Sequence, residues 1–290
     1  MIQFKHVMKQ YQHNHPVISN INLDIPTGVF GLLGTNGAGK TTMLRLLATL
    51  VRPSSGKLLI EGMDVEQDAH LIRKFIGYMP QSFQAQPMIT GREFLDYVAM
   101  TKGFSVQALR KKQVESKLEE VGLMERADNR IKTYSNGMKQ RLGIAQAIIG
   151  DPSVLIIDEP TSGLDLDERV QFRTLLQRYG TKGTVVISTH IAADIESCCS
   201  RLAVLNKGQI RFHGGSSELA AVAQGYVWDA MLTDEQFVQL RTERLVSAKK
   251  QEGGVLCRII AEQAPVSGAR LLEPTLEDGY LALIGGCRLE

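Results

Sequence analysis

The chain has 290 residues, of which 43% are hydrophobic and 22% are charged, values close to those of an average globular protein. Lys and Arg number 33 against 31 Asp and Glu, so the net charge of +2 creates no large field that would favour nucleic acid or an anionic membrane surface as a partner. Four cysteines without zinc-ligand spacing are typical of a reducing compartment. No run approaches the roughly 18 apolar residues of a membrane span and no signal peptide opens the chain, so we expect a soluble, cytoplasmic protein.

The first predicted elements lead into a glycine-rich loop. Residues 21–25 alternate between apolar and polar, which predicts a half-buried strand, and the uniformly apolar 29–33 predicts a strand covered on both faces. The next residues satisfy G-x-x-x-x-G-K-[ST], a phosphate loop in which backbone N–H groups cradle phosphates, Lys40 reaches the β- and γ-phosphates and Thr41 binds Mg²⁺. We expect a nucleotide to contact the whole loop, which consists of Gly34, Thr35, Asn36, Gly37, Ala38, Gly39, Lys40, Thr41 and Thr42.

A helical insertion is predicted between about residues 90 and 150. It opens with Thr90 and Glu93 at the spacing of a capping box. Apolar residues then recur at helical spacing in two stretches, and a glycine follows each of them as a helix stop. The first stretch comprises Val114, Leu118 and Val121 before Gly122, and the second comprises Met138, Leu142, Ala145 and Ile149 before Gly150.

Two more apolar runs, 154–158 and 184–189, predict further buried strands. Residues 169–179 between them show helical periodicity, and we expect Gly180 to stop that helix. Strands that alternate with helices in this way predict a parallel α/β sheet.

An acidic pair, Asp158 and Glu159, stands at the end of the first of these two strands, where open α/β sheets bind their ligands. The Asp158 carboxylate suits Mg²⁺ held directly or through water, and Glu159 suits the polarisation of an attacking water. The alternative is an acidic pair that only caps the next element.

The rest of the chain predicts two hairpins and a closing helix. Residues 201–215 favour a hairpin that turns at 206–208, and GGSS at 214–217 is the best candidate for a domain boundary. Beyond it we expect a second hairpin around 249–254 and a helix that Thr275 caps.

The stretch YSNGMKQR, residues 134–141, predicts a second anion site. A serine and a glycine two positions apart precede a basic, helix-forming run. Unpaired backbone N–H groups and the helix dipole favour negative charge at a helix N-terminus. One domain would therefore carry this site in addition to its phosphate loop.

These motifs together resemble those of the ATP-binding cassette (ABC) transporters. GTNGAGKTT, YMPQ, YSNGMKQR, LIIDEPTSGLD and ISTH occur in the order found in the nucleotide-binding subunit, over about residues 1–215. The resemblance implies an α/β P-loop NTPase core with an antiparallel β subdomain and an inserted helical subdomain at about 85–150. Residues 216–290 would form a small α+β accessory region, either a stabilising extension or a regulatory site.

The resemblance also implies roles for single residues. Tyr11 would stack on adenine, although an ordinary strand-edge tyrosine is the alternative. Gln81 would bind Mg²⁺ or the attacking water and sense the membrane subunit, and His190 would contact the γ-phosphate. Asp165 would lie at a dimer interface. The implied catalytic residues are Lys40, Gln81, Glu159 and His190, and the implied metal ligands are Thr41, Gln81 and Asp158.

In this family two subunits pack head to tail, and each signature loop closes on the ATP held by the other subunit. Ser135, Asn136, Gly137 and Met138 would form that loop here. Asn136 stands where relatives have a glycine, and Met138 where they have a glutamine. We expect the loop shape to survive because asparagine tolerates the left-handed conformation better than most residues.

The export-type branch of the family, whose ATPase is a separate chain, is the most similar. The implied function is an ATP-hydrolysing subunit that uses ATP and Mg²⁺, pairs with an identical subunit and drives a polytopic membrane permease from the inner face of the cell membrane. An ABC ATPase acting on ribosomes or DNA is one alternative, but such proteins usually carry two cassettes or a long coiled-coil insertion. A nucleotide-dependent regulator without turnover is the other, which the presence of Glu159 disfavours.

Large apolar residues follow Gln81, and we expect three of them to receive a short helix of the permease. These are Phe83, Met88 and Tyr97. Ordinary core of the helical subdomain is the alternative for this group.

Overall fold

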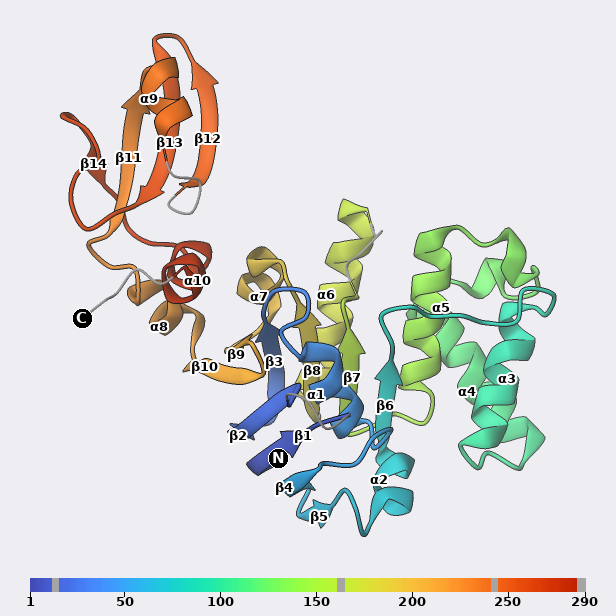
Figure 1. The fold of residues 1–290 in the computed structure, drawn as a ribbon. Helices are drawn as coiled ribbons and strands as arrows, with labels where there is room; N and C mark the ends of the chain where they lie inside the picture. The colour runs from blue at the N-terminus through green and yellow to red at the C-terminus, as the bar shows by residue number, and fades with distance from the viewer. Residues whose placement is uncertain (12–15, 161–164, 241–244, 286–290) are drawn as a thin grey trace.

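The computed structural model describes residues 1–11, 16–160, 165–240 and 245–285. Figure 1 shows a central body of sheets with flanking helices, a group of helices on one side of it and a C-terminal sheet on the other. The central body contains the phosphate loop and the strands that were predicted to be buried.

A six-stranded sheet forms the centre of this body. Its strands are β3 (Gly28–Leu33), β6 (Ile76–Met79), β7 (Val154–Asp158), β8 (Thr184–Thr189), β9 (Arg201–Asn206) and β10 (Gln209–Gly214). They lie in the order β10-β9-β3-β8-β7-β6, and all neighbours are parallel except β10, which pairs antiparallel with β9. Every residue of β7 and β8 is buried, so the two predicted strands and the parallel sheet are confirmed.

A second, antiparallel sheet packs on one side of the first. Its strands are β1 (Ile2–Lys9), β2 (Ile18–Ile25), β4 (Ser55–Ile60) and β5 (Met63–Asp64), and the helix α2 (Ala69–Phe75) follows them. The helix α1 (Lys40–Leu47) buries Leu44 and Leu47 in one apolar cluster with Phe4 of β1 and Val186 of β8. Burial against both sheets fixes the start of α1, and with it the phosphate loop.

The insertion is helical, as predicted. It contains α3 (Gly91–Thr101), α4 (Gln107–Glu120) and α5 (Asn136–Ile148), with short 3₁₀ turns at Met124–Arg126 and Ile131–Thr133. Thr90 Oγ1 accepts from the backbone N–H of Glu93 at 3.1 Å, and the Glu93 carboxylate accepts from the backbone N–H of Thr90 at 2.7 Å, which confirms the capping box. The apolar positions Val114, Leu118 and Leu142 are buried in the largest apolar cluster of the molecule.

Two helices, α6 (Leu166–Gly180) and α7 (Ala192–Cys198), pack on the central sheet. The prediction that Gly180 stops a helix is wrong, because Gly180 is the last residue of α6 and Thr181 caps it. A Cβ atom at Gly180 would lie 2.7 Å from Cγ2 of Val29. The glycine therefore lets the helix end approach β3 closely.

The two predicted hairpins are confirmed. The strands β9 and β10 turn at Lys207 and Gly208, both of which have positive φ, as the type I′ turn of a tight hairpin requires. In the C-terminal part, β12 (Leu245–Gln251) and β13 (Gly254–Ile260) form the second hairpin. They belong to a sheet of order β12-β13-β11-β14, completed by β11 (Val227–Leu232) and β14 (Arg270–Leu271).

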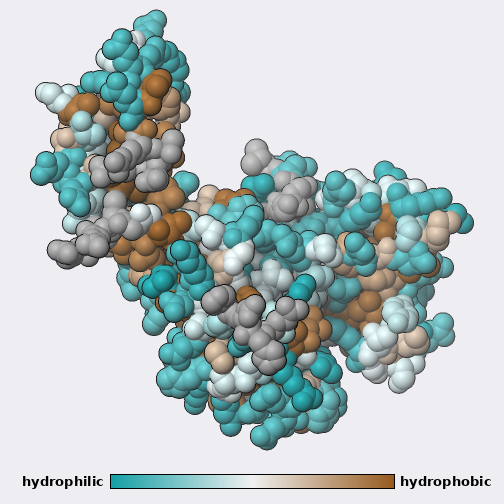
Figure 2. All heavy atoms as spheres, viewed as in Figure 1, coloured by the Kyte–Doolittle hydropathy of each residue, from teal (hydrophilic) through white to brown (hydrophobic). Residues whose placement is uncertain are grey.

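Three helices accompany this sheet: α8 (Ser216–Ala221), α9 (Asp234–Gln239) and α10 (Leu276–Ile284). Thr275 caps α10, as predicted. Leu219 of α8, together with Leu276 and Tyr280 of α10, belongs to the same apolar cluster as the central sheet and the helical insertion. Figure 2 shows apolar side chains gathered at the foot of the C-terminal sheet, near α8 and α10. Among the described residues, no helix combines the length and the apolar character needed to span a bilayer.

Candidate functional site

The phosphate loop joins β3 to α1. Gly37 and Gly39 have φ values of 79° and 109°, a left-handed region that favours glycine. Thr35, Asn36 and Gly37 are exposed, whereas the following residues are buried up to the start of the helix. The loop therefore presents its exposed backbone at the edge of the sheet where β3 ends.

Lys40, the first residue of α1, is buried and folds back over this loop. Its ammonium donates to the carbonyl of Gly34 at 2.8 Å and to that of Thr35 at 3.2 Å. Thr41 is half-buried and Thr42 buried in the first turn of the helix. The lysine charge thus stands inside the loop, where phosphates are bound in P-loop proteins.

Asp158, the last residue of β7, is 1% exposed. Its Oδ1 accepts a hydrogen bond from Ser188 Oγ, whereas its Oδ2 is buried and has no hydrogen-bond partner within the part of the chain that the structure describes. A buried polar atom without a partner costs free energy, and carboxylate oxygens are preferred ligands of Mg²⁺. The donor set therefore fits a Mg²⁺ ion at this strand end.

The neighbouring Glu159 has a strained backbone. Its φ of 48° is unusual for a residue other than glycine, and left-handed geometry costs roughly 1–2 kcal/mol. The backbone N–H of Glu159 donates to the carbonyl and to the hydroxyl of Ser188, each at 3.1 Å. These bonds to β8 hold the strained residue in place.

The Glu159 carboxylate is the point at which three predicted catalytic residues meet. Gln81, which follows β6, donates from Nε2 to Oε2 at 2.8 Å. The other oxygen, Oε1, lies 3.4 Å from Lys40 Nζ and 3.4 Å from His190 Nδ1. The order β3-β8-β7-β6 explains this meeting, because parallel strands bring their carboxyl ends, and the loops that follow, to one edge of the sheet.

The signature stretch begins α5. Ser135 is the N-cap, and its Oγ accepts from the backbone N–H of Met138 at 3.1 Å. Ser135 and Asn136 are exposed, Gly137 is buried and Met138 is half-buried. The expectation of a left-handed Asn136 is wrong, because Asn136 is the first residue of the helix α5. The position therefore does not need a residue that tolerates the left-handed conformation. Among the described residues, no hydrogen bond or ion pair joins Ser135, Asn136, Gly137 or Met138 to the Glu159 carboxylate of the same chain.

Two further predicted residues stand outside the cluster. Tyr11 is exposed, and Lys9 Nζ lies 5.1 Å from the centre of its ring. Asp165 is the N-cap of α6 and forms a capping box with Glu168. The remainder of that motif, residues 161–164, lies outside the described residues.

Sequence reasoning missed Ser188 and Gln140. Ser188 supports both acidic residues of the site, and the one signal for it was a polar residue in a strand otherwise rich in valine and isoleucine. Gln140 of α5 donates to the carbonyl of Pro160 at 2.8 Å and so connects the signature helix to the segment after Glu159. A contact of this kind leaves no mark in the sequence.

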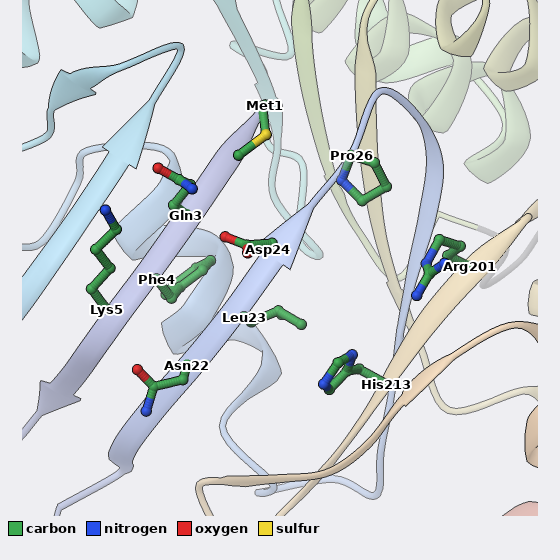
Figure 3. Close-up of a pocket in the computed structure, with 10 residues that line it drawn as sticks. All are labelled: Met1, Gln3, Phe4, Lys5, Asn22, Leu23, Asp24, Pro26, Arg201 and His213. Atoms are coloured by element: carbon green, nitrogen blue, oxygen red, sulfur yellow. The ribbon is translucent and has the colours of Figure 1, made fainter.

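A cleft of about 560 Å³ lies elsewhere, between β1 and β2 on one side and β9 and β10 on the other. Figure 3 shows Leu23 of β2 pointing toward His213, whereas the side chains of Asn22 and Asp24 point to the side of β2 on which Gln3 and Lys5 lie. None of the predicted site residues lines this cleft, so it is separate from the candidate site.

A phosphate loop, an acidic strand end and a histidine at one edge of a parallel sheet define the class of P-loop ATPases. The family model described as ABC transporter matches residues 18–162. The chain therefore belongs to the ABC transporter family, as an ATP-binding subunit. It is an ATPase that uses ATP and Mg²⁺, and the family and the fold class expected from the sequence are confirmed.

Relatives and solved structures agree with this assignment. The uncharacterized ABC transporter ATP-binding protein YxlF of Bacillus subtilis is 35% identical over 249 residues, which cover 86% of this chain and 82% of the relative. Nod factor export ATP-binding protein I of Cupriavidus metallidurans is 34% identical over an alignment of 298 positions, gaps included, which covers 98% of this chain and 97% of that protein. The dimeric post-hydrolysis structure of the ATP-binding cassette MJ0796 bound to ADP and Pi is 26% identical, with a TM-score of 0.66 over 74% of this chain and 98% of that one.

Proposed function

We propose that this chain is the ATP-hydrolysing subunit of an export transporter: two copies close on ATP and drive a separate membrane permease, which holds them at the inner face of the cell membrane. The convergence of Lys40, Gln81 and His190 on Glu159 carries the hydrolytic part of the proposal. The similarity to a Nod factor export protein over nearly the whole length of both chains supports the export direction.

The phosphate loop, Gly34 to Thr42, would hold the ATP phosphates through its backbone N–H groups. Lys40 now donates to two carbonyls of its own loop, and it would turn these donors to the β- and γ-phosphates. The Thr41 hydroxyl, Gln81 and the unpartnered oxygen of Asp158 would hold Mg²⁺. The ion would supply positive charge that offsets the charge developing on the phosphate oxygens.

Glu159 would polarise the attacking water. Its carboxylate is held by Lys40, and phosphates that engage the lysine would release one carboxylate oxygen for the water. Gln81 would keep the other oxygen oriented. His190, beside the same carboxylate, would contact the γ-phosphate.

The signature residues Ser135, Asn136, Gly137 and Met138 would complete the site of the partner subunit, and Asp165 would lie at the dimer interface. The exposed Ser135 at the start of α5 supports this role, because a helix N-terminus favours an anion. Tyr11 would stack on adenine through its exposed ring. We further propose that residues 1–215 form the nucleotide-binding domain, with a helical subdomain at about 85–150, and that residues 216–290 are accessory.

The test of the shared site uses two inactive variants. Lys40→Ala removes the charge of the phosphate loop, and Ser135→Arg blocks the signature loop. Each homodimer should be inactive, because both of its composite sites carry a defect. In a mixed dimer, one site collects both defects while the other joins the intact phosphate loop of the Ser135→Arg subunit to the intact signature loop of the Lys40→Ala subunit.

Mixing the two variants should therefore restore ATP-dependent dimerisation and part of the ATPase activity. If Ser135 acted on the ATP of its own subunit, every site in the mixture would stay defective. If both variants are folded and exchange subunits but recover neither dimerisation nor ATPase activity, the shared site is refuted.

A further inference from the structure

The carboxylate of Glu168, in the first turn of α6, joins three segments of one subunit. Its Oε2 accepts from the backbone N–H of Asp165 at 3.2 Å. Its Oε1 lies 3.4 Å from Nη2 of Arg141. A Cβ atom at Gly137 would lie 2.4 Å from that same oxygen, so the carboxylate rests directly against the signature glycine.

These contacts exceed what the cap of α6 needs. Of the Glu168 carboxylate, a capping box requires only that it accept the backbone N–H of Asp165. The contacts with Gly137 and Arg141 lie on two successive turns of a different helix, α5. The side chains of Glu168 and Arg141 are 19% and 24% exposed, so the ion pair is sheltered and less screened than one on the open surface.

The two segments that Glu168 connects are the ones assigned to the dimer interface. The signature loop opens α5, and Asp165 opens α6. A rigid link between them would let both reach the ATP of the partner subunit in a fixed relation, and a displacement of about 1 Å at such a site can cost 10²-fold in rate.

We propose that Glu168 is a positioning residue that holds the signature loop against the Asp165 segment of its own subunit and thereby sets how that loop meets the ATP of the partner. The inference rests on the proposed shared site. Glu168 acts through Gly137 and Arg141 and touches no substrate itself.

Three substitutions separate this role from plain helix stability. Glu168→Ala removes the contacts with all three partners. Glu168→Gln keeps the size and an acceptor for the Asp165 backbone but removes the charge that pairs with Arg141, so it should rescue part of the loss. Asp167→Asn is the matched control, because it removes an exposed carboxylate from the same first turn of α6.

The decisive experiment places Glu168→Ala on one subunit of the mixed dimer at a time. On the Lys40→Ala subunit, which supplies the working signature loop, it should lower the recovered ATPase activity by roughly 10-fold to 100-fold and raise the ATP concentration for half-maximal rate. On the Ser135→Arg subunit, whose signature loop is already blocked, the change should stay within about twofold. Asp167→Asn should stay within about twofold on either subunit.

If Glu168→Ala lowers the ATPase activity equally on either subunit, the defect is a general structural one. That result would overturn the positioning role but would leave the shared site standing. If the mixture in which Glu168 is intact shows no ATPase activity, the shared site is overturned, and this inference falls with it. If Glu168→Ala does not fold, Glu168→Gln is placed on the same two subunits in turn. It must then also lower the ATPase activity more on the Lys40→Ala subunit than on the Ser135→Arg subunit.

Discussion

The carboxylate of Glu159 contacts side chains from three other segments of the chain while its own backbone stays in a strained conformation. The two bonds from its N–H to Ser188 hold that conformation, and the contacts with Lys40, Gln81 and His190 aim the carboxylate. A strained backbone conformation that is held by several surrounding contacts is typical of functional sites. At the scale of the residue, the proposed hydrolysis therefore depends on the charge of this one group.

Replacing Glu159 with glutamine keeps its size and one acceptor oxygen for the hydrogen bond from Gln81 but removes the negative charge and the basic oxygen. ATP should still bind, while the steady-state rate of hydrolysis should fall by roughly 10²-fold to 10⁴-fold. Glu196→Gln, an exposed glutamate on α7, is the control and should leave the rate unchanged. Wild-type turnover in Glu159→Gln would remove Glu159 from the mechanism.

At the scale of elements, a buried lysine ties the helical insertion to the central body. Lys117 of α4 donates to Asp151 at 2.5 Å, to Glu120 at 2.9 Å and to the hydroxyl of Tyr179 at 3.1 Å. Burial alone would lower the pKa of Lys117, but these hydrogen bonds outweigh it and raise the pKa above its ordinary value. Burial also raises the pKa of Tyr179 to about 12. The network joins α4 to the end of α6 and to the loop before β7.

Asp151 gives this network a dependence on pH. Burial works to raise its pKa, but the hydrogen bond and the charge of Lys117, with smaller contributions from Gln113 and Lys182, together outweigh burial and lower the pKa below its ordinary value of 3.8. Because the pKa is depressed in the folded state, the stabilisation is present above pH 3.8 and is lost as the pH falls through the folded pKa.

Asp151→Asn should therefore lower the free energy of unfolding at pH 7 by about 1 kcal/mol, a modest value because the carboxylate is 61% exposed and screened by solvent. The difference from wild type, measured by urea unfolding, should shrink below pH 3.8. Glu252→Gln, in the exposed turn between β12 and β13, is the control and should show no such change. A difference that stays constant from pH 7 to pH 3 would contradict the role of the charge.

The sequence predicted elements well where the signal was local. Largely apolar runs identified β7 and β8, the Thr90 cap followed from its spacing to Glu93, and the Thr275 cap followed from a threonine directly before a helical pattern. The prediction for Gly180 failed because this glycine lets the end of α6 approach Val29, a residue that is distant along the chain.

The same contrast holds in the site. Lys40, Gln81, Glu159 and His190 were predicted from motifs, and the structure brings them together. Ser188 and Glu168 were missed, because their contacts join separate elements and depend on how α5, α6 and the sheet pack.

At the scale of the whole molecule, the C-terminal part is joined to the central body by two helices. Leu219 of α8 and Leu276 of α10 share the main apolar cluster, whereas β11 and β13 bury one separate cluster and share a small one with Ala282 of α10. The ends of the sheet lie side by side, because the N–H of Leu272 donates to the carbonyl of Val227 at 2.8 Å. A deletion between these two residues therefore removes the sheet and keeps both helices, but it also removes Arg258 of β13, which pairs with the buried Asp278 of α10.

Deleting residues 228–271 and joining Val227 to Leu272 removes none of the predicted site residues. The ATP concentration for half-saturation should therefore stay within about twofold of wild type, a change of only a few tenths of a kcal/mol in binding free energy. A chain that ends at Ser217 should also bind ATP but unfold at a lower temperature, since it loses α8 and α10 from the core. Loss of ATP binding in a folded deletion variant would contradict an accessory role.

The permease contact is predicted at the segment after Gln81. Met88 is 53% exposed and Tyr97 is also exposed, whereas Phe83 packs on Phe94 with ring centres 5.6 Å apart. Phe83 thus serves the core of the insertion, and the exposed pair is left to meet a partner.

A cysteine at Met88 should crosslink to a polytopic membrane protein in native membranes. Met231→Cys on β11 is the matched control, because Met231 is a methionine with a similar exposure of 44%. Capture from position 231 with none from position 88 would place the permease on the C-terminal sheet and refute the prediction.

The central claim is that two copies close on ATP through their signature loops, and the solution mass of Glu159→Gln tests it most directly. Light scattering should give the 32.0 kDa monomer without nucleotide and twice that mass with ATP and Mg²⁺, because ATP is bound but not consumed. Adding Ser135→Arg to the same chain should return the mass to that of the monomer while ATP still binds. A monomer with ATP bound to Glu159→Gln, or a dimer that persists with Ser135→Arg, would contradict the account.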